Sequence, residues 1–84
     1  EVIIVDNNSN NHVIEKLYNN TKLTNLRIIK ENRQGLTWAR ICGIKNSKTD
    51  IIVFVDDDNI LNENYLLIAH EIFTKNTRLG CIGG

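Results

Sequence analysis

Short apolar runs, each followed by a segment with helical periodicity, constrain the fold of this chain more than any other feature. The clearest runs are EVIIV at residues 1–5 and IIVFV at residues 51–55, with a shorter one, LRIIKE, at residues 26–31. The first two show no alternation between apolar and polar residues, which is typical of strands buried on both faces of a sheet. The chain is therefore expected to place parallel strands side by side.

The segments between these runs predict helices. Helical patterns begin at Asn11, after Ser9 or Asn10 as the N-cap, continue after Gly35, and run from Asn62 to about residue 76. A last apolar stretch, LGCIGG at residues 79–84, predicts another strand or a loop. The order β-α-β-α-β-α-β predicts an α/β fold of three α/β/α layers around a mainly parallel sheet, with residues 1–84 as a single domain.

Composition excludes several classes of function. The formal net charge is zero, so no basic surplus is available to bind nucleic acid or an anionic membrane. No apolar run approaches the roughly 20 residues that a membrane-spanning helix needs. Cys42 and Cys81 fit no metal or redox spacing and are expected to be reduced core residues, which favours a cytoplasmic location.

Acidic residues follow two of the predicted strands. Asp6 comes directly after the first run, and Asp56, Asp57 and Asp58 come directly after the run at residues 51–55. In open α/β sheets, ligands bind outside the carboxyl ends of the strands. Three adjacent carboxylates repel one another unless a cation or a donor offsets them, and Mg²⁺ is commonly bound by one or two carboxylates together with substrate phosphates. A simpler reading is that these residues only form a turn.

The order of these motifs resembles the nucleotide-sugar-binding half of a family 2 glycosyltransferase of the GT-A fold. The segment VDNNS resembles the acidic turn after the second strand of that family. Asn32, Gly35, Ala39 and Arg40 fill a block of the form N-x-x-G-x-x-x-A-R, and Asp56–Asp58 contain a DxD motif after an apolar strand. The resemblance covers essentially the whole chain and implies an incomplete Rossmann-like GT-A domain.

The resemblance implies roles for individual residues in the first half of the chain. Asp6 and Asn7 correspond to the acidic turn that contacts the nucleotide base. The family often has a second Asp where this chain has Asn7, and an amide both donates and accepts whereas a carboxylate only accepts. Arg40 either approaches the phosphates of the nucleotide or pairs with an Asp at a strand end. Trp38 is expected to pack in the core.

The resemblance also implies a metal site in the second half. Asp56 and Asp57 correspond to carboxylates that meet the ribose or a metal-bound water, and Asp58 corresponds to the ligand of Mn²⁺ or Mg²⁺ that bridges the diphosphate, with Asp56 as the second metal residue. The partners implied are a nucleotide-diphospho-sugar donor and an acceptor that is a glycan, a lipid or a protein. The parent protein is expected in the cytoplasm or at the cytoplasmic face of a membrane.

Two family features are not found in this sequence. The first strand of the family, which lies between its second and fourth strands, has no counterpart here, so the runs at residues 1–5 and 51–55 would flank an empty slot. A homo-oligomer that completes the sheet is therefore expected. The general base, an Asp or Glu downstream of the DxD motif, cannot be assigned either. The chain is expected to be a fragment that binds donor but does not turn over.

Two other functions remain open from the sequence. The segment VFVDDDNIL fits the pattern of haloacid-dehalogenase phosphatases, in which Asp56 would be the nucleophile and Asp58 the general acid, with Mg²⁺ between them. That motif normally lies on the first strand of its domain, whereas here two strand–helix units precede it. The third possibility is a non-catalytic, truncated α/β module that only self-associates.

Overall fold

The computed structural model describes residues 1–83, with the backbone alone described at Asn11. The chain divides into two compact units, Glu1–Thr49 and Asp50–Gly84, which are described separately below. The described elements follow the order β1, α1, β2, α2, α3, and together they form the α/β fold that the sequence predicts. No helix among residues 1–83 is long and apolar enough to cross a membrane.

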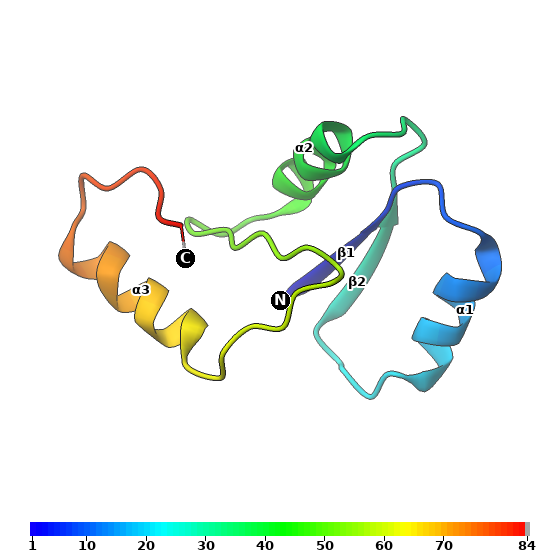
Figure 1. Cartoon of the computed structure of the whole chain (residues 1–84), viewed down its shortest axis with the longest axis horizontal. Helices are drawn as coiled ribbons and strands as arrows, with labels where there is room; N and C mark the ends of the chain where they lie inside the picture. The colour runs from blue at the N-terminus through cyan, green and yellow to red at the C-terminus, as the bar shows by residue number, and fades with distance from the viewer. Residues whose placement is uncertain (84) are drawn as a thin grey trace. The chain divides into compact units, whose positions relative to one another are not determined.

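The first unit is built on two parallel strands, as predicted. β1 (Val2–Asp6) and β2 (Leu26–Lys30) lie side by side in register from the pair Val2 and Leu26 to the pair Asp6 and Lys30 (Figure 1). The helix α1 (Asn11–Asn20) connects them, with Asn10 at the N-cap position. The parallel pairing brings the carboxyl ends of both strands to the same edge of the sheet.

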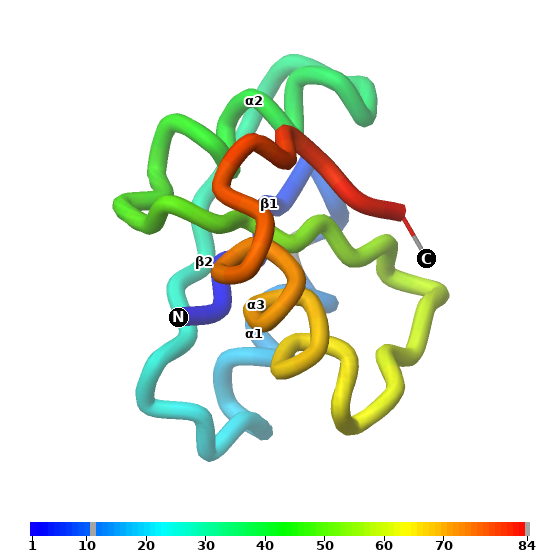
Figure 2. The backbone as a smooth tube through the Cα atoms, turned by 90° about the vertical axis from the view of Figure 1, so that its left-hand side faces the viewer, coloured from blue at the N-terminus to red at the C-terminus, as the bar shows by residue number. Residues whose placement is uncertain are grey.

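The second helix of this unit, α2 (Leu36–Asn46), packs against β1. Its connection to β2 can be followed in Figure 2. A Cβ atom built on Gly43 would lie 3.6 Å from Cγ2 of Val5, an ordinary van der Waals distance, so Gly43 faces the strand but an alanine would also fit. The sequence predicts that this glycine packs against the sheet, because a glycine inside a helix costs roughly 1 kcal/mol relative to alanine; the packing is found, but the available space does not require glycine.

The second unit contains α3 (Tyr65–Lys75) and a segment at residues 51–55 that is not a strand. The prediction of a strand there was wrong for the described structure, whereas residues 79–83 form a loop, one of the two states predicted for them; Gly84 lies outside the described residues. Apolar content alone does not make a strand, because a strand requires a ladder with a neighbour, and the sheet among residues 1–83 consists of β1 and β2.

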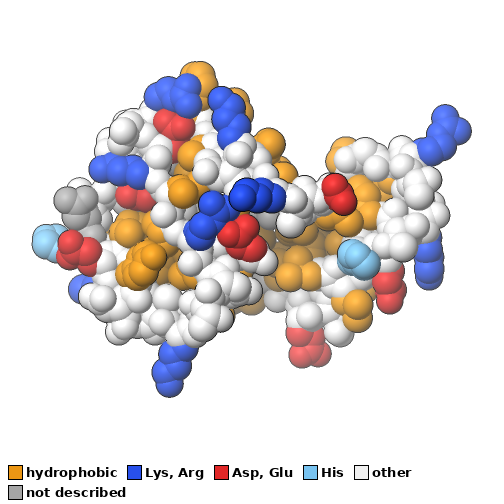
Figure 3. All heavy atoms as spheres, turned by 180° about the vertical axis from the view of Figure 1, so that it is seen from behind, with side chains coloured by type: hydrophobic (Ala, Val, Ile, Leu, Met, Phe, Trp, Pro, Cys, Tyr) orange, Lys and Arg blue, Asp and Glu red, His pale blue; other side chains and the backbone are white. Residues whose placement is uncertain are grey.

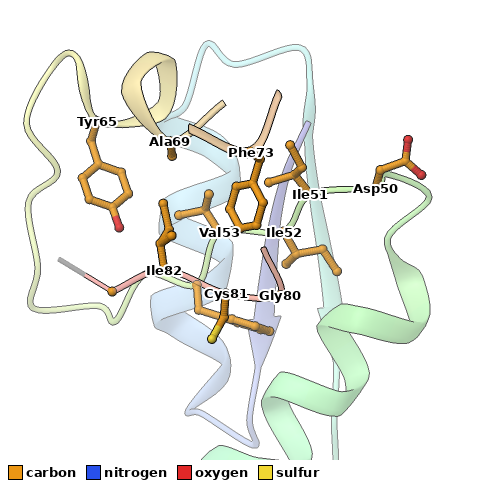
Figure 4. Close-up of a pocket in the computed structure, with 12 residues that line it drawn as sticks. Asp50, Ile51, Ile52, Val53, Tyr65, Ala69, Phe73, Gly80, Cys81 and Ile82 are labelled. Carbon is orange, nitrogen blue, oxygen red and sulfur yellow. The ribbon is translucent and has the colours of Figure 1, made fainter. Parts of the chain in front are cut away.

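An open cavity of about 460 Å³ lies within the second unit. It is lined by residues 50–54, one side of α3 and residues 80–83. Figure 4 shows Phe73 of α3 pointing toward the side chain of Val53, with Ala69 above them on the same helix. Ala69 is the buried hydrophobic residue among those described, so the apolar side chains of this unit meet without closing over a core.

Many large apolar side chains reach the surface, as the orange areas in Figure 3 illustrate. The predictions that Cys81 and Trp38 pack in a core were therefore wrong. Cys81 is exposed, whereas Cys42 is half-buried, and both are free thiols. Trp38 is 41% exposed. Its ring contacts an arginine of the preceding loop instead of packing in a core, as shown in the next subsection.

Candidate functional site

Asp6 ends β1 and is buried, with only 8% of its surface exposed. Its Oδ1 accepts a hydrogen bond from the backbone N–H of Ser9 at 2.8 Å. Hydrogen bonds from the backbone and side chain of Ser9 lower the pKa of Asp6, and the charge of Lys30 lowers it further, against the opposing effect of burial. Asp6 therefore carries a negative charge at neutral pH at the carboxyl end of the sheet.

The turn after Asp6 has a defined conformation. Asn8 has a φ of 64°, in the left-handed region that asparagine tolerates better than most residues. The hydrogen bond between Asp6 and Ser9 spans this residue and closes the turn. The run of short polar residues that the sequence places here is therefore used to reverse the chain between β1 and α1.

The side chain of Asn7 is hydrogen bonded to the loop that follows β2. Its Nδ2 donates to the backbone oxygen of Glu31 at 3.1 Å and to that of Arg33 at 2.6 Å. Its Oδ1 accepts from the backbone N–H of Gly35 at 2.8 Å. Both donor hydrogens of the amide and one of its two acceptor positions are thus used by backbone groups.

Glu31 and Arg33 form a structured pair within the same loop. The Glu31 carboxylate, buried at 8% exposure, accepts from the Arg33 backbone N–H at 2.9 Å, from Nε at 3.0 Å and from Nη2 at 2.9 Å. These bonds lower the pKa of Glu31 to about 2, and the charge of Lys45 contributes. The Arg33 guanidinium also lies over the ring of Trp38, 3.9 Å from its centroid.

Arg40 lies on α2, just over one helical turn after Gly35 at the N-cap position, and its side chain is exposed. Gly35 has a φ of 131°, which L side chains rarely adopt. Its carbonyl accepts from the backbone N–H of Ala39 at 3.1 Å and so begins the helix. Asp6 ends β1 and Arg40 lies on α2, and the Asn7 side chain links the turn after β1 to the N-cap residue of α2.

Asp56, Asp57 and Asp58 lie in the second unit, and all three are exposed. The backbone N–H of Asn59 donates to the backbone oxygen of Asp56 at 3.1 Å, and Asp57 and Asp58 occupy the turn that this bond closes. The structure therefore places three exposed carboxylates next to one another on one tight turn.

The donor chemistry of this turn fits a hard divalent cation. Carboxylate oxygens are the ligands that Mg²⁺ and Mn²⁺ prefer. Within residues 1–83, no three His, Cys, Asp or Glu side chains converge as a ready-made metal cage. Cations of this type are commonly held by only one or two carboxylates plus substrate phosphates, so a cage of protein ligands is not needed.

Sequence reasoning missed the cluster of Glu31, Arg33 and Trp38. A signal for it exists in the sequence, since an acid directly after a strand, an arginine two residues on and an aromatic in the next helical turn can all reach one another. The hydrogen bonding of Asn7 to the backbone could not have been read from the sequence, because its three partners lie 24 to 28 residues further along the chain.

The family described as glycosyl transferase family 2 matches residues 1–84. No curated protein and no solved structure matches the chain significantly.

Proposed function

Because the chain belongs to glycosyl transferase family 2, we propose that it forms the donor-binding part of an enzyme that transfers a glycosyl group from a nucleotide-diphospho-sugar to an acceptor. The family supports glycosyl transfer in general. The observation that carries the proposal is the exposed turn Asp56–Asp58 directly after the apolar segment at residues 51–55. Such a turn presents carboxylates without burying unpaired charge.

We propose roles in nucleotide binding for individual residues of each unit. Asp6, ionised at the end of β1, would accept hydrogen bonds from donor groups of the nucleotide. Arg40, exposed on α2, would approach the diphosphate. Asp57 and Asp56 would meet the ribose or a metal-bound water. Asn7 belongs to the same site, although backbone groups already engage most of its amide.

Asp58 and Asp56 are proposed to hold Mn²⁺ or Mg²⁺. When bound, such an ion neutralises the charge that develops on the departing nucleoside diphosphate. The protein's contribution is to keep the carboxylates together on the turn that the Asn59 N–H closes on Asp56. No catalytic base is assigned, and the acceptor, whether glycan, lipid or protein, is left unassigned as well.

We also propose that the apolar segment at residues 51–55 is covered by a second copy of the chain. Phe54 and Val55 are each 48% exposed, and burying apolar surface is favourable by roughly 25 cal/mol per Å². A second copy laid against this segment would cover its exposed apolar side chains.

The free thiols of Cys42 and Cys81 are consistent with a reducing, cytoplasmic setting.

Isothermal titration calorimetry on the protein expressed from its complete reading frame tests the proposal. UDP, GDP, ADP and CDP are titrated with and without Mn²⁺, and one of them is expected to bind in a manner that requires the metal. Absence of binding by every nucleotide would favour a module that only self-associates. A stable beryllofluoride adduct at Asp56 would instead favour a phosphatase of the haloacid-dehalogenase class.

A further inference from the structure

The side chain of Asn7 joins two connections that are far apart in the sequence. It leaves the turn after β1 and makes hydrogen bonds to the backbone of Glu31, Arg33 and Gly35. These three residues span the whole connection from the end of β2 to the start of α2. One amide therefore ties the turn that carries Asp6 to the loop that leads into the helix of Arg40.

This arrangement requires an amide. The Nδ2 group donates to two carbonyl oxygens, whereas Oδ1 accepts from an N–H. A carboxylate could satisfy only the Gly35 N–H, and it would place negative charge against the oxygens of Glu31 and Arg33. An apolar side chain would satisfy none of the three. Asparagine is thus chemically matched to its backbone partners.

The structure around the connection explains why a tie is useful there. Gly35 has a φ of 131°, and its N–H precedes the first turn of α2. Within the same loop, Arg33 also donates hydrogen bonds to Glu31. Asn7 therefore binds the first residue of the loop, Glu31, and the last, Gly35. Because α2 begins directly after Gly35, these bonds help to set the orientation of α2 relative to β1.

We propose that Asn7 is a positioning residue, which fixes the connection from β2 to α2 against the turn of Asp6 and so sets the relative placement of Asp6 and Arg40 for nucleotide binding. The nucleotide part rests on the proposed function above. An amide is needed at position 7 because the backbone groups of Glu31, Arg33 and Gly35 bind it. A nucleotide base is then read by other groups of the site.

Three variants test this in the full chain: Asn7→Ala, Asn7→Asp and, as a control of matched charge, Asn8→Asp. Asn8 is the exposed neighbour of Asn7. Hydrogen exchange of the Gly35 amide is expected to be at least about tenfold faster in Asn7→Ala, because the acceptor is lost, and in Asn7→Asp, because repulsion from the carbonyl oxygens of Glu31 and Arg33 draws the carboxylate away from the Gly35 N–H. Nucleotide affinity is expected to fall roughly tenfold or more at neutral pH, and Asn8→Asp to change neither by more than about twofold.

The Asn7→Asp variant adds a readout that simple loss of structure would not give. Facing two carbonyls, the new carboxyl group should have a pKa above its unfolded value of about 3.9, so its penalty is relieved as pH falls from 7 toward that value. A protonated carboxyl group can again donate to one carbonyl. The charged neighbours do not mask this effect, because Glu31 has a pKa of about 2, the pKa of Asp6 is lowered and that of Arg33 is raised.

The expected result is that the protection factor of the Gly35 amide, taken relative to the intrinsic exchange rate at each pH, rises between pH 7 and 4.5 in Asn7→Asp but not in Asn7→Ala. Wild-type exchange rates at Gly35 in Asn7→Ala would overturn the proposal, as would unchanged nucleotide affinity in both Asn7 variants. If the wild-type protein bound no nucleotide, the proposed function and the nucleotide part of this inference would fail together. The exchange experiment would still decide whether Asn7 holds the connection.

Discussion

The guanidinium of Arg33 lies over the indole ring of Trp38, 3.9 Å from its centroid, while its nitrogens donate to the carboxylate of Glu31. The ring belongs to α2 and the arginine to the loop before it. This contact accounts for the position of a large aromatic that is 41% exposed and not in a core. The backbone oxygen of Arg33 also accepts a hydrogen bond from Asn7.

A double-mutant cycle measures this contact. Arg33→Gln and Trp38→Leu are combined, and unfolding in urea is followed by circular dichroism. A coupling free energy of about 0.5–1 kcal/mol is expected for a cation over an exposed ring. The same cycle with Ile44→Ala in place of Trp38→Leu serves as the control, since Ile44 is an exposed residue near the other end of α2. Equal coupling in both cycles would contradict the assignment.

The ionised state of Glu31 predicts a dependence of stability on pH. Its folded pKa is about 2, below the ordinary value of 4.5, because Arg33 donates to it. The stabilisation is therefore fully present above pH 4.5 and is lost as pH falls toward 2. Asp6, whose pKa is also lowered, adds to the same loss at the acid end.

Replacement of Glu31 by Gln should flatten this acid response. Urea midpoints measured at pH 5, 4 and 3 are expected to fall less steeply for Glu31→Gln than for the wild-type protein. Glu15→Gln, on the exposed surface of α1, controls for the change in net charge. An unchanged slope in Glu31→Gln would mean that its carboxylate does not stabilise the fold by ionisation.

Replacement by alanine should have opposite effects on stability at Gly35, the N-cap residue of α2, and at Gly43 within that helix. At Gly43 a new Cβ would meet Val5 at 3.6 Å, an ordinary contact, so Gly43→Ala should stabilise the protein by up to about 1 kcal/mol through helix propensity. At Gly35 the φ of 131° is strained for any L side chain, and Gly35→Ala should destabilise by about 1–3 kcal/mol. Thermal unfolding of both variants tests the contrast, and a loss of stability in Gly43→Ala would show tighter packing than described.

The exposed apolar segment at residues 51–55 predicts association. Light scattering at micromolar concentration is expected to give the mass of a dimer. Val55→Lys should shift the protein toward the monomer, because it places a charge in the surface that would be covered. Thr77→Lys adds the same charge in an exposed turn and should leave the dimer intact. A compact, stable monomer in the wild-type protein would remove this part of the account.

The sequence predicts the first unit well and the second unit less well. β1, β2 and both helices of the first unit follow from local signals, since each strand contains β-branched residues and the helices follow an asparagine and a glycine at their N-cap positions. The segment at residues 51–55 carries the strongest strand signal but is not a strand in the described residues. Its state depends on a neighbouring backbone, and a sequence pattern cannot supply that neighbour.

The candidate site divides in the same way. The position of Asp6 at a strand end and of Asp56–Asp58 on a turn could be predicted, because strand ends and turns have local signatures. The use of the Asn7 amide by the backbone of the loop before α2 could not, because it depends on how β1 and β2 pair. The residue types indicated which polar side chains belong to the candidate site. The pairing of β1 with β2 determined that the backbone, and not a ligand, binds most of the Asn7 amide.

The most direct measurement is a crystal structure of the protein, expressed from its complete reading frame, with Mn²⁺ and the nucleoside diphosphate that calorimetry selects. Anomalous scattering is expected to place the ion about 2.0–2.3 Å from a carboxylate oxygen of Asp58, with Asp56 beside it and the diphosphate completing the coordination. Asp58→Asn should then weaken metal-dependent nucleotide binding about tenfold or more. An ion bound elsewhere, with Asp56–Asp58 turned into solvent in the presence of nucleotide, would contradict the account.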